Sequence, residues 1–210
     1  MDQSAENVEK MLEQITKDEL MVREILATAK LLFAQHGLKK TTMEDIAHAM
    51  GKGKSTLYYY FPGKLEIFEA VVDEEMKNLL RITRRAINMV IPAQEKLKAF
   101  SRTRISVMEK FQNLSDVVYK EVFNHVGEIL RLKQKHDELQ VELVREIIEG
   151  GVKSGEFREL ADNDIGLFSY TLVAAFRGLE LPLTVSPFIK SSGHGTNVLV
   201  DMLVEGIKGK

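Results

Sequence analysis

Apolar residues recur every three or four positions along most of the chain, the spacing that places them on one side of a helix. The stretches Leu20–Phe33 and Leu65–Leu79 show this clearly, and no run alternates apolar and polar residues long enough to predict a strand. The pattern therefore predicts an all-α protein. Helices are expected at about 20–36, 42–50, 54–61, 64–90, 94–112, 116–132, 137–154, 162–180 and 195–207.

Glycine and proline mark the expected boundaries between helices. Gly37 is placed to end the first helix in the left-handed conformation, and Gly51-Lys52-Gly53 can only be a turn. Pro62 and Gly63 end the helix that follows. The domains expected are a polar N-terminal extension (1–17), a small three-helix head (18–64) and a larger helical body (65–210).

The two short helices at about 42–61, joined by a glycine turn, have the organisation of a helix-turn-helix. Thr42 is a natural N-cap, and Asp45 stands where a capping box usually has Glu or Gln. In the second helix Leu57 and Phe61 are four residues apart and are expected to face inward. The opposite side then presents hydroxyls and tyrosines.

Charge is concentrated in this segment. The chain has a formal net charge of -2, but between His36 and Lys64 there is a local excess of +3. The lysines are 39, 40, 52, 54 and 64, and the acids are Glu44 and Asp45. A local basic face on a slightly acidic protein favours DNA binding. Lys39 and Lys40 are better explained as solvated loop charges.

The run Tyr58-Tyr59-Tyr60-Phe61 would in most helices be core packing. Successive helical residues are about 100° apart, so four aromatic side chains in a row cannot all face one core. With Leu57 and Phe61 inward, Tyr58 and Tyr59 are expected to point outward.

Three segments, Gly37–Ala47, Ser55–Phe61 and Lys64–Phe68, together resemble the DNA-binding domain of the TetR family of repressors. A weaker similarity covers Ile147–Gly151 and Gly155–Arg158. The resemblance implies an N-terminal helix-turn-helix that binds a palindromic operator in double-stranded DNA. It also implies a helical body that binds a small-molecule effector and forms a homodimer, and it implies no enzyme.

The resemblance implies DNA contacts from Thr42, Lys52, Lys54, Ser55, Thr56, Tyr58, Tyr59, Tyr60 and Lys64. Thr56 and Tyr58 are the candidates for reading base edges. Tyr59 and Tyr60 are expected to donate hydrogen bonds to DNA phosphates. Lys64 matches a lysine with which members of the family bind the DNA backbone. Lys52 replaces a small apolar residue of the family pattern, and Gly53 replaces a capping serine, so the second helix is expected to begin less firmly.

The last two predicted helices, 162–180 and 195–207, are apolar on two sides, so each side needs a packing partner. One side can pack on the chain's own body, and the other favours a second copy. The residues expected at the dimer interface are Phe168, Leu172, Phe176, Leu179, Leu199, Met202 and Leu203.

Apolar side chains in the middle of the body predict a largely hydrophobic effector, although most of them can equally be core. The candidate lining residues are Phe100, Ile105, Met108, Phe111, Tyr119, Phe123 and His125. Glu121 and His125 have metal-ligand spacing, but the sequence offers no third ligand. No metal and no cofactor is therefore expected.

Other classes receive little support. The chain has no cysteine, no apolar run near the roughly 18 residues of a membrane span, no signal peptide and no catalytic motif, so a cytoplasmic protein is expected. Two alternatives stay open. One is a DNA-binding regulator of this fold that has no small-molecule effector and acts through a protein partner or as an activator. The other is a helical interaction protein that does not bind DNA.

Overall fold

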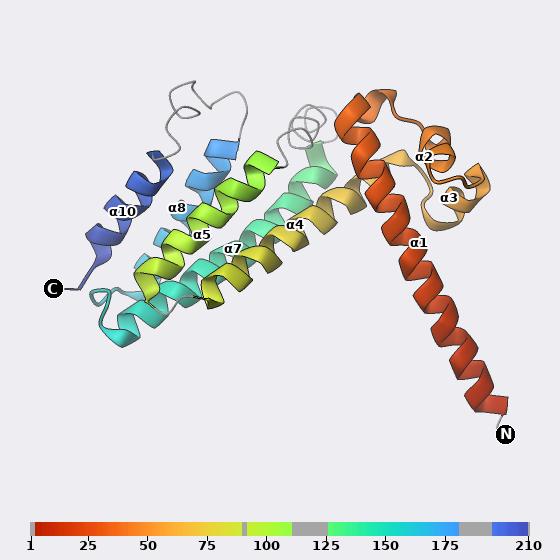
Figure 1. The fold of residues 1–210 in the computed structure, drawn as a ribbon. Helices are drawn as coiled ribbons and strands as arrows, with labels where there is room; N and C mark the ends of the chain where they lie inside the picture. The colour runs from red at the N-terminus through yellow and green to blue at the C-terminus, as the bar shows by residue number, and fades with distance from the viewer. Residues whose placement is uncertain (1–2, 90–91, 111–125, 181–194, 210) are drawn as a thin grey trace. The chain divides into compact units, whose positions relative to one another are not determined.

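A computed structural model of the chain describes residues 3–89, 92–110, 126–180 and 195–209, which fold as helices (Figure 1). In chain order these are α1 (Gln3–Lys40), α2 (Met43–Ala49), α3 (Lys54–Tyr60), α4 (Lys64–Asn88), α5 (Ala93–Lys110), α7 (Val126–Ser154), α8 (Asp162–Glu180) and α10 (Gly195–Ile207). No strand occurs in this described part, where the one β-type contact is an isolated bridge between Phe157 and Lys208. The predicted all-α class is confirmed.

The chain divides into two compact units, Met1–Glu74 and Glu75–Lys210, and the division falls inside α4. Within the described residues, no helix combines the length and the apolar character needed to cross a membrane.

The first unit is built on the buried side of α1. Ile25, Ala29 and Phe33 follow one another at four-residue spacing and are fully buried. Phe33 packs edge-on against Phe68 of α4, with ring centroids 5.5 Å apart. Helix α2 packs against both α1 and α3, and Leu57 of α3 is fully buried. The helix-turn-helix therefore packs on a core to which α1 and the first part of α4 also contribute.

The predicted break at Gly37 is confirmed, since this residue has φ 80° and ψ 162°. Three more residues are helical after it, so α1 ends at Lys40 rather than at the glycine. At its other end α1 begins at Gln3, and the polar segment 1–17 is therefore largely a continuation of this helix.

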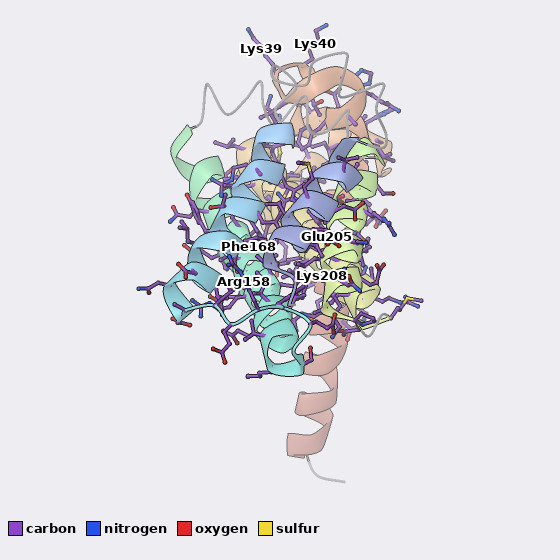
Figure 2. All side chains as sticks on the ribbon, turned by 90° about the vertical axis from the view of Figure 1, so that its left-hand side faces the viewer. Lys39, Lys40, Arg158, Phe168, Glu205 and Lys208 are labelled. Carbon is purple, nitrogen blue, oxygen red and sulfur yellow. The ribbon has the colours of Figure 1, made fainter. Side chains whose placement is uncertain are left out.

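The second unit is a bundle in which α7 packs against α5 and α8, and α5 packs against α10 (Figure 1). Its core is mostly aliphatic, with the rings of Phe100 and Phe176 in edge contact at 6.0 Å. The end of α10 is tied to the turn after α7, because Arg158 N–H donates to the Ile207 carbonyl at 2.9 Å (Figure 2).

One predicted boundary in the body is wrong. Separate helices were expected at 116–132 and 137–154, but α7 runs without a break from Val126 to Ser154. The intervening residues 133–136 contain no glycine or proline, and lysine and glutamine are good helix formers. Polar composition alone therefore does not end a helix here.

Candidate nucleic-acid interface

Helix α2 begins with a complete capping box. The Thr42 hydroxyl oxygen accepts from the Asp45 N–H at 3.1 Å, and the Thr42 N–H donates to the Asp45 carboxylate at 2.8 Å. The Thr42 hydroxyl also donates to that carboxylate, and these hydrogen bonds hold the pKa of Asp45 below its usual value. The predicted cap is confirmed with Asp in the third position, although Glu and Gln are the usual residues there.

Thr42→Ala is expected to lower the free energy of unfolding of the first unit by about 1 kcal/mol, because the Asp45 N–H loses its acceptor and the Asp45 carboxylate loses the hydroxyl donor. The folded-state pKa of Asp45 is depressed, so the stabilisation is present above the ordinary carboxyl pKa and is lost as pH falls through the folded value. The loss of stability caused by Thr42→Ala should therefore be smaller at acid pH than at neutral pH. Urea denaturation at neutral and acid pH measures it, with the exposed Ser55→Ala as control. An equal loss of stability at both pH values would show that the hydrogen bonds between Thr42 and the ionised Asp45 are not its cause.

The turn between α2 and α3 depends on glycine. Gly51 has φ +63°, a conformation that side-chain-bearing residues rarely adopt. Its N–H donates to the His48 carbonyl at 3.0 Å, and the Lys52 N–H donates to Ala47 at 2.9 Å. Gly53 is the N-cap of α3 and provides no side-chain hydrogen bond, which agrees with the weaker helix start expected from the sequence.

Helix α3 presents one polar, aromatic side. Leu57 is fully buried, whereas Tyr58 and Tyr59 are 47% and 74% exposed, so the tyrosines point outward as expected. Lys54 and Ser55 are exposed beside them. One buried leucine thus fixes a helix whose opposite side offers hydroxyl, ammonium and aromatic groups.

Tyr60 differs from the two tyrosines before it. Its hydroxyl donates to the Asp18 carboxylate of α1 at 2.8 Å, and this hydrogen bond raises the pKa of the phenol. The single hydroxyl proton is therefore committed within the protein. In the DNA-free chain this hydrogen bond competes with the predicted role of Tyr60 as a phosphate donor. Its ring also meets Tyr59 edge-on, at 4.8 Å between centroids.

Lys64 at the start of α4 is likewise bound within the protein. Its Nζ donates to the carbonyl oxygens of Leu38 at 2.7 Å, Thr41 at 2.8 Å and Lys39 at 3.4 Å. The ammonium thus lies at the C-terminal end of α1, where the helix dipole favours a positive charge. These internal hydrogen bonds compete with the predicted contact between this ammonium and the DNA backbone. In the DNA-free chain the ammonium holds the connection between α1 and α2.

An ion pair that the sequence did not predict joins α2 to α3. Lys54 Nζ lies 2.7 Å from a Glu44 carboxylate oxygen and 5.9 Å from the centre of the Tyr58 ring. The hydrogen bond to Glu44 raises the pKa of Lys54. The two residues are ten positions apart across a turn, so no helical spacing could have indicated the pair. Glu44 therefore neutralises one lysine of the candidate DNA-binding face.

The structure divides the predicted body residues between core and surface. Phe100 is fully buried, and Ile105 packs partly buried against the same core. Leu172 and Phe176 are also buried in the chain's own core, which argues against their predicted place in a dimer interface, whereas Leu167 on another side of α8 is exposed. Phe168 packs partly buried, whereas Met202 and Leu203 are exposed as expected.

Several predicted positions lie outside the described residues. They are Phe111, Tyr119, Glu121, Phe123 and His125, together with the side chains of Met108, Leu179 and Leu199. Across the described part of the chain, no group of three or more histidine and acidic side chains could hold a metal ion.

Comparison with known proteins gives one consistent result. Residues 25–71 match the family model of bacterial regulatory proteins of the tetR family. The transcriptional repressor KstR2 of Rhodococcus jostii is 28% identical over 146 residues, or 69% of this chain and 70% of that protein. The fatty acid metabolism regulator protein of Bacillus subtilis is 26% identical over 142 residues, or 66% of this chain and 72% of that protein.

A solved structure agrees over most of the chain. The transcriptional regulator from Cytophaga hutchinsonii matches with a TM-score of 0.73 at 26% identity, covering 88% of this chain and 96% of that one. The matched family segment contains α2, α3 and the start of α4. The comparisons are with transcriptional regulators and not with enzymes.

Proposed function

The chain belongs to the TetR family of DNA-binding transcriptional regulators, and from that premise we propose a homodimeric repressor that leaves a palindromic operator when a small, largely apolar molecule binds. The observation that carries this proposal is the exposed side of α3. Tyr58 and Tyr59 project from a helix that the buried Leu57 fixes to the core. A helix presented in this way can enter a major groove. We also propose a cytoplasmic location, where operator DNA is found.

The contacts are assigned by position on α3. Thr56 and Tyr58 read base edges, and a tyrosine ring can also pack on a thymine methyl. The phosphate contacts come from Lys52, which precedes α3, and from Lys54, Ser55 and Tyr59 on it, all of which are exposed. In the DNA-free chain the hydroxyl of Thr42 already donates to Asp45, so a phosphate would compete with that carboxylate for its proton. Backbone N–H groups at the start of α3 add a further attraction for phosphate.

The homodimer is proposed to form through α8 and α10, which lie side by side on the face toward the viewer in Figure 2. Large apolar side chains are exposed on both helices: Leu167, Tyr170, Val198, Met202 and Leu203. Exposed apolar side chains on neighbouring helices are typical of an interaction site. A second copy fits the operator proposal, because two recognition helices related by a two-fold axis read two half-sites.

The effector is proposed to act by changing the distance between the two helix-turn-helix units of the dimer. Helix α4 belongs to both compact units, so a shift in the body can reach the helix-turn-helix through it. An apolar effector is supported by the similarity to a fatty acid metabolism regulator. It is also supported by the aliphatic and aromatic interior of the body.

The test is selection from a randomised duplex library with the purified full-length protein, followed by sequencing. We expect an enriched inverted repeat whose half-sites are separated by about one helical turn or a multiple of it. No enriched sequence at any salt concentration would contradict the proposed function and would support an interaction protein that does not read DNA.

Glu44→Gln is expected to tighten operator binding about three- to tenfold. The substitution releases Lys54 from its partner and removes a negative charge from the DNA-binding face. Fluorescence anisotropy over a salt series measures the change, and Glu66→Gln, an exposed acid of α4, is the matched control. An unchanged or weaker affinity for Glu44→Gln would show that the ion pair does not oppose DNA binding.

A further inference from the structure

Glu44 is an acid on the face that is proposed to bind DNA, and its ion pair with Lys54 does not by itself explain this position. The side chain of Glu44 is 69% exposed, and the side chain of Lys54 is 47% exposed. Ion pairs with this exposure contribute little to stability, because both groups are well solvated before they pair. A negative charge on this face also opposes binding to phosphates. Stability therefore does not account for an acid here.

The N-terminal cap of α2 does not depend on Glu44 either. The helix dipole favours an acid in the first turn, but Asp45 already provides one there. The Asp45 carboxylate accepts from the N–H and the hydroxyl of Thr42, at 2.8 and 2.7 Å. Helices α2 and α3 pack together, and each contributes a fully buried side chain, Ile46 and Leu57. A neutral residue at position 44 would therefore leave the cap and the core of the helix-turn-helix intact.

Contacts across the glycine turn fix the position of the Glu44 carboxylate. Glu44 lies in the first turn of α2, and Lys54 is the first residue of α3. One oxygen of Glu44 lies 2.7 Å from Lys54 Nζ, and this nitrogen lies 5.9 Å from the centre of the Tyr58 ring. Tyr58 follows Lys54 by four residues and so lies on the same side of α3. A carboxylate, an ammonium and a phenol therefore form one exposed cluster at the N-terminal end of α3.

This end of the second helix is the part of a helix-turn-helix that meets base edges. An ammonium has three donors, so Lys54 can keep its hydrogen bond to Glu44 while it donates to a DNA phosphate. The carboxylate is then neutralised and held beside Tyr58 in the bound state. A carboxylate has only acceptor oxygens, so it needs a donor on the base that it meets.

The donors on the major-groove edges of the bases are the amino groups of cytosine and adenine. The cytosine amino group has one neighbouring acceptor, O6 of the paired guanine. The adenine amino group lies between two acceptors, its own N7 and O4 of the paired thymine. Each neighbouring acceptor repels a carboxylate, so cytosine is the base that suits Glu44 best.

We propose that Glu44 reads a cytosine in each half-site of the operator, where its carboxylate accepts a hydrogen bond from the N4 amino group. Lys54 is a positioning residue that neutralises this carboxylate and holds it beside Tyr58. Glu44 thus weakens binding to DNA in general and weakens it least for the operator. This inference rests on the proposed function and names a further specificity-determining residue on the same face.

The first measurement is the library selection, carried out with the unmodified full-length protein and with Glu44→Gln and Glu44→Ala. Both variants should lose the preference at one C·G base pair in each half-site and keep the rest of the inverted repeat. The reason is that an amide can donate as well as accept, whereas a methyl group does neither. Glu66→Gln, at an exposed acid of α4, should select the unmodified sequence. Unchanged preferences in both Glu44 variants, or a change confined to an A·T base pair, would overturn the proposal.

The second measurement is fluorescence anisotropy with the selected duplex and with a duplex in which thymine replaces this cytosine in both half-sites. The unmodified protein should bind the substituted duplex at least about tenfold more weakly, because thymine O4 repels the carboxylate. For Glu44→Gln the two duplexes should differ by less than about threefold, since its amide can donate to O4. Equal tightening by Glu44→Gln on both duplexes would show that Glu44 only repels phosphates, and the proposal would be wrong.

Lys54→Met separates the roles of the two partners. It should lower the slope of log K against log salt by about one and keep the cytosine preference, because the carboxylate and not the ammonium reads the base. A preference lost in Lys54→Met but retained in both Glu44 variants would assign the base contact to the lysine and overturn the proposal. If the unmodified protein enriches no sequence, the proposed function fails together with this inference. An enriched sequence that neither Glu44 variant alters contradicts this inference alone.

Discussion

Replacing Leu167 and Met202 together by arginine is expected to produce a monomer that binds the operator at least about 100-fold more weakly. Both side chains are apolar and more than half exposed, one on α8 and the other on α10. A charge on each would remain solvated in the monomer and would have to lose its water in a dimer. A monomer engages one half-site at a time and so loses the gain in affinity from linked binding.

The control is Leu139→Arg, which places the same charge on an exposed leucine of α7. Sedimentation velocity measures the oligomeric state, and anisotropy with the selected duplex measures affinity. The control should remain dimeric and bind normally. A double variant that stays dimeric would exclude this face, and a monomer with full affinity would exclude the need for two half-sites.

Lys64→Met is expected to lower the free energy of unfolding of the first unit by about 1–3 kcal/mol, because the partly buried carbonyls of Leu38 and Thr41 lose their donor. The connection between α1 and α2 then loses its link to α4. Operator affinity should fall on every sequence, since the helix-turn-helix is less well positioned. Urea denaturation and a salt series of binding measurements quantify the two effects.

The salt series separates this role from the phosphate contact expected from the sequence. A lost phosphate contact would reduce the slope of log K against log salt by about one, whereas a lost internal contact leaves the slope unchanged. Lys39→Met and Lys40→Met, which change exposed lysines of the same connection, are matched controls for stability (Figure 2). A stable Lys64→Met protein with a reduced slope would contradict the internal role.

The helix-turn-helix could be predicted from the sequence because its signals are local. A capping residue with an acid three positions later, a glycine that takes positive φ, and helical spacing each act within a few residues. Thr42, Gly51 and Leu57 accordingly have the predicted capping, turn and buried positions. The family motif covers the same segment.

Contacts between distant residues could not be predicted in this way. Asp18 lies 42 positions from Tyr60, and Lys64 reaches back 26 positions to Leu38, so both pairings depend on how the helices pack. The two apolar sides of α8 pose the same problem. Spacing identifies both sides, but only packing against α7 determines that Leu172 is turned toward the core and Leu167 away from it.

The burial of polar side chains on α5 and α7 could not be predicted from periodicity either. His136 and Gln140 continue the face of α7 on which Val144 and Ile148 lie, but they are polar, so hydrophobic periodicity does not extend the buried stripe to them. The structure buries both side chains together with Arg104. Buried polar residues are therefore positions where the sequence pattern fails and where a specific role is worth testing.

Base preference is the measurement that decides whether α3 reads DNA sequence. The library selection is repeated with Tyr58→Ala and compared with the unmodified protein under the same salt conditions. We expect that Tyr58→Ala still binds duplex DNA but loses or changes its preference at one or two positions in each half-site. An identical selected sequence at undiminished enrichment would contradict the reading role assigned to the exposed side of α3.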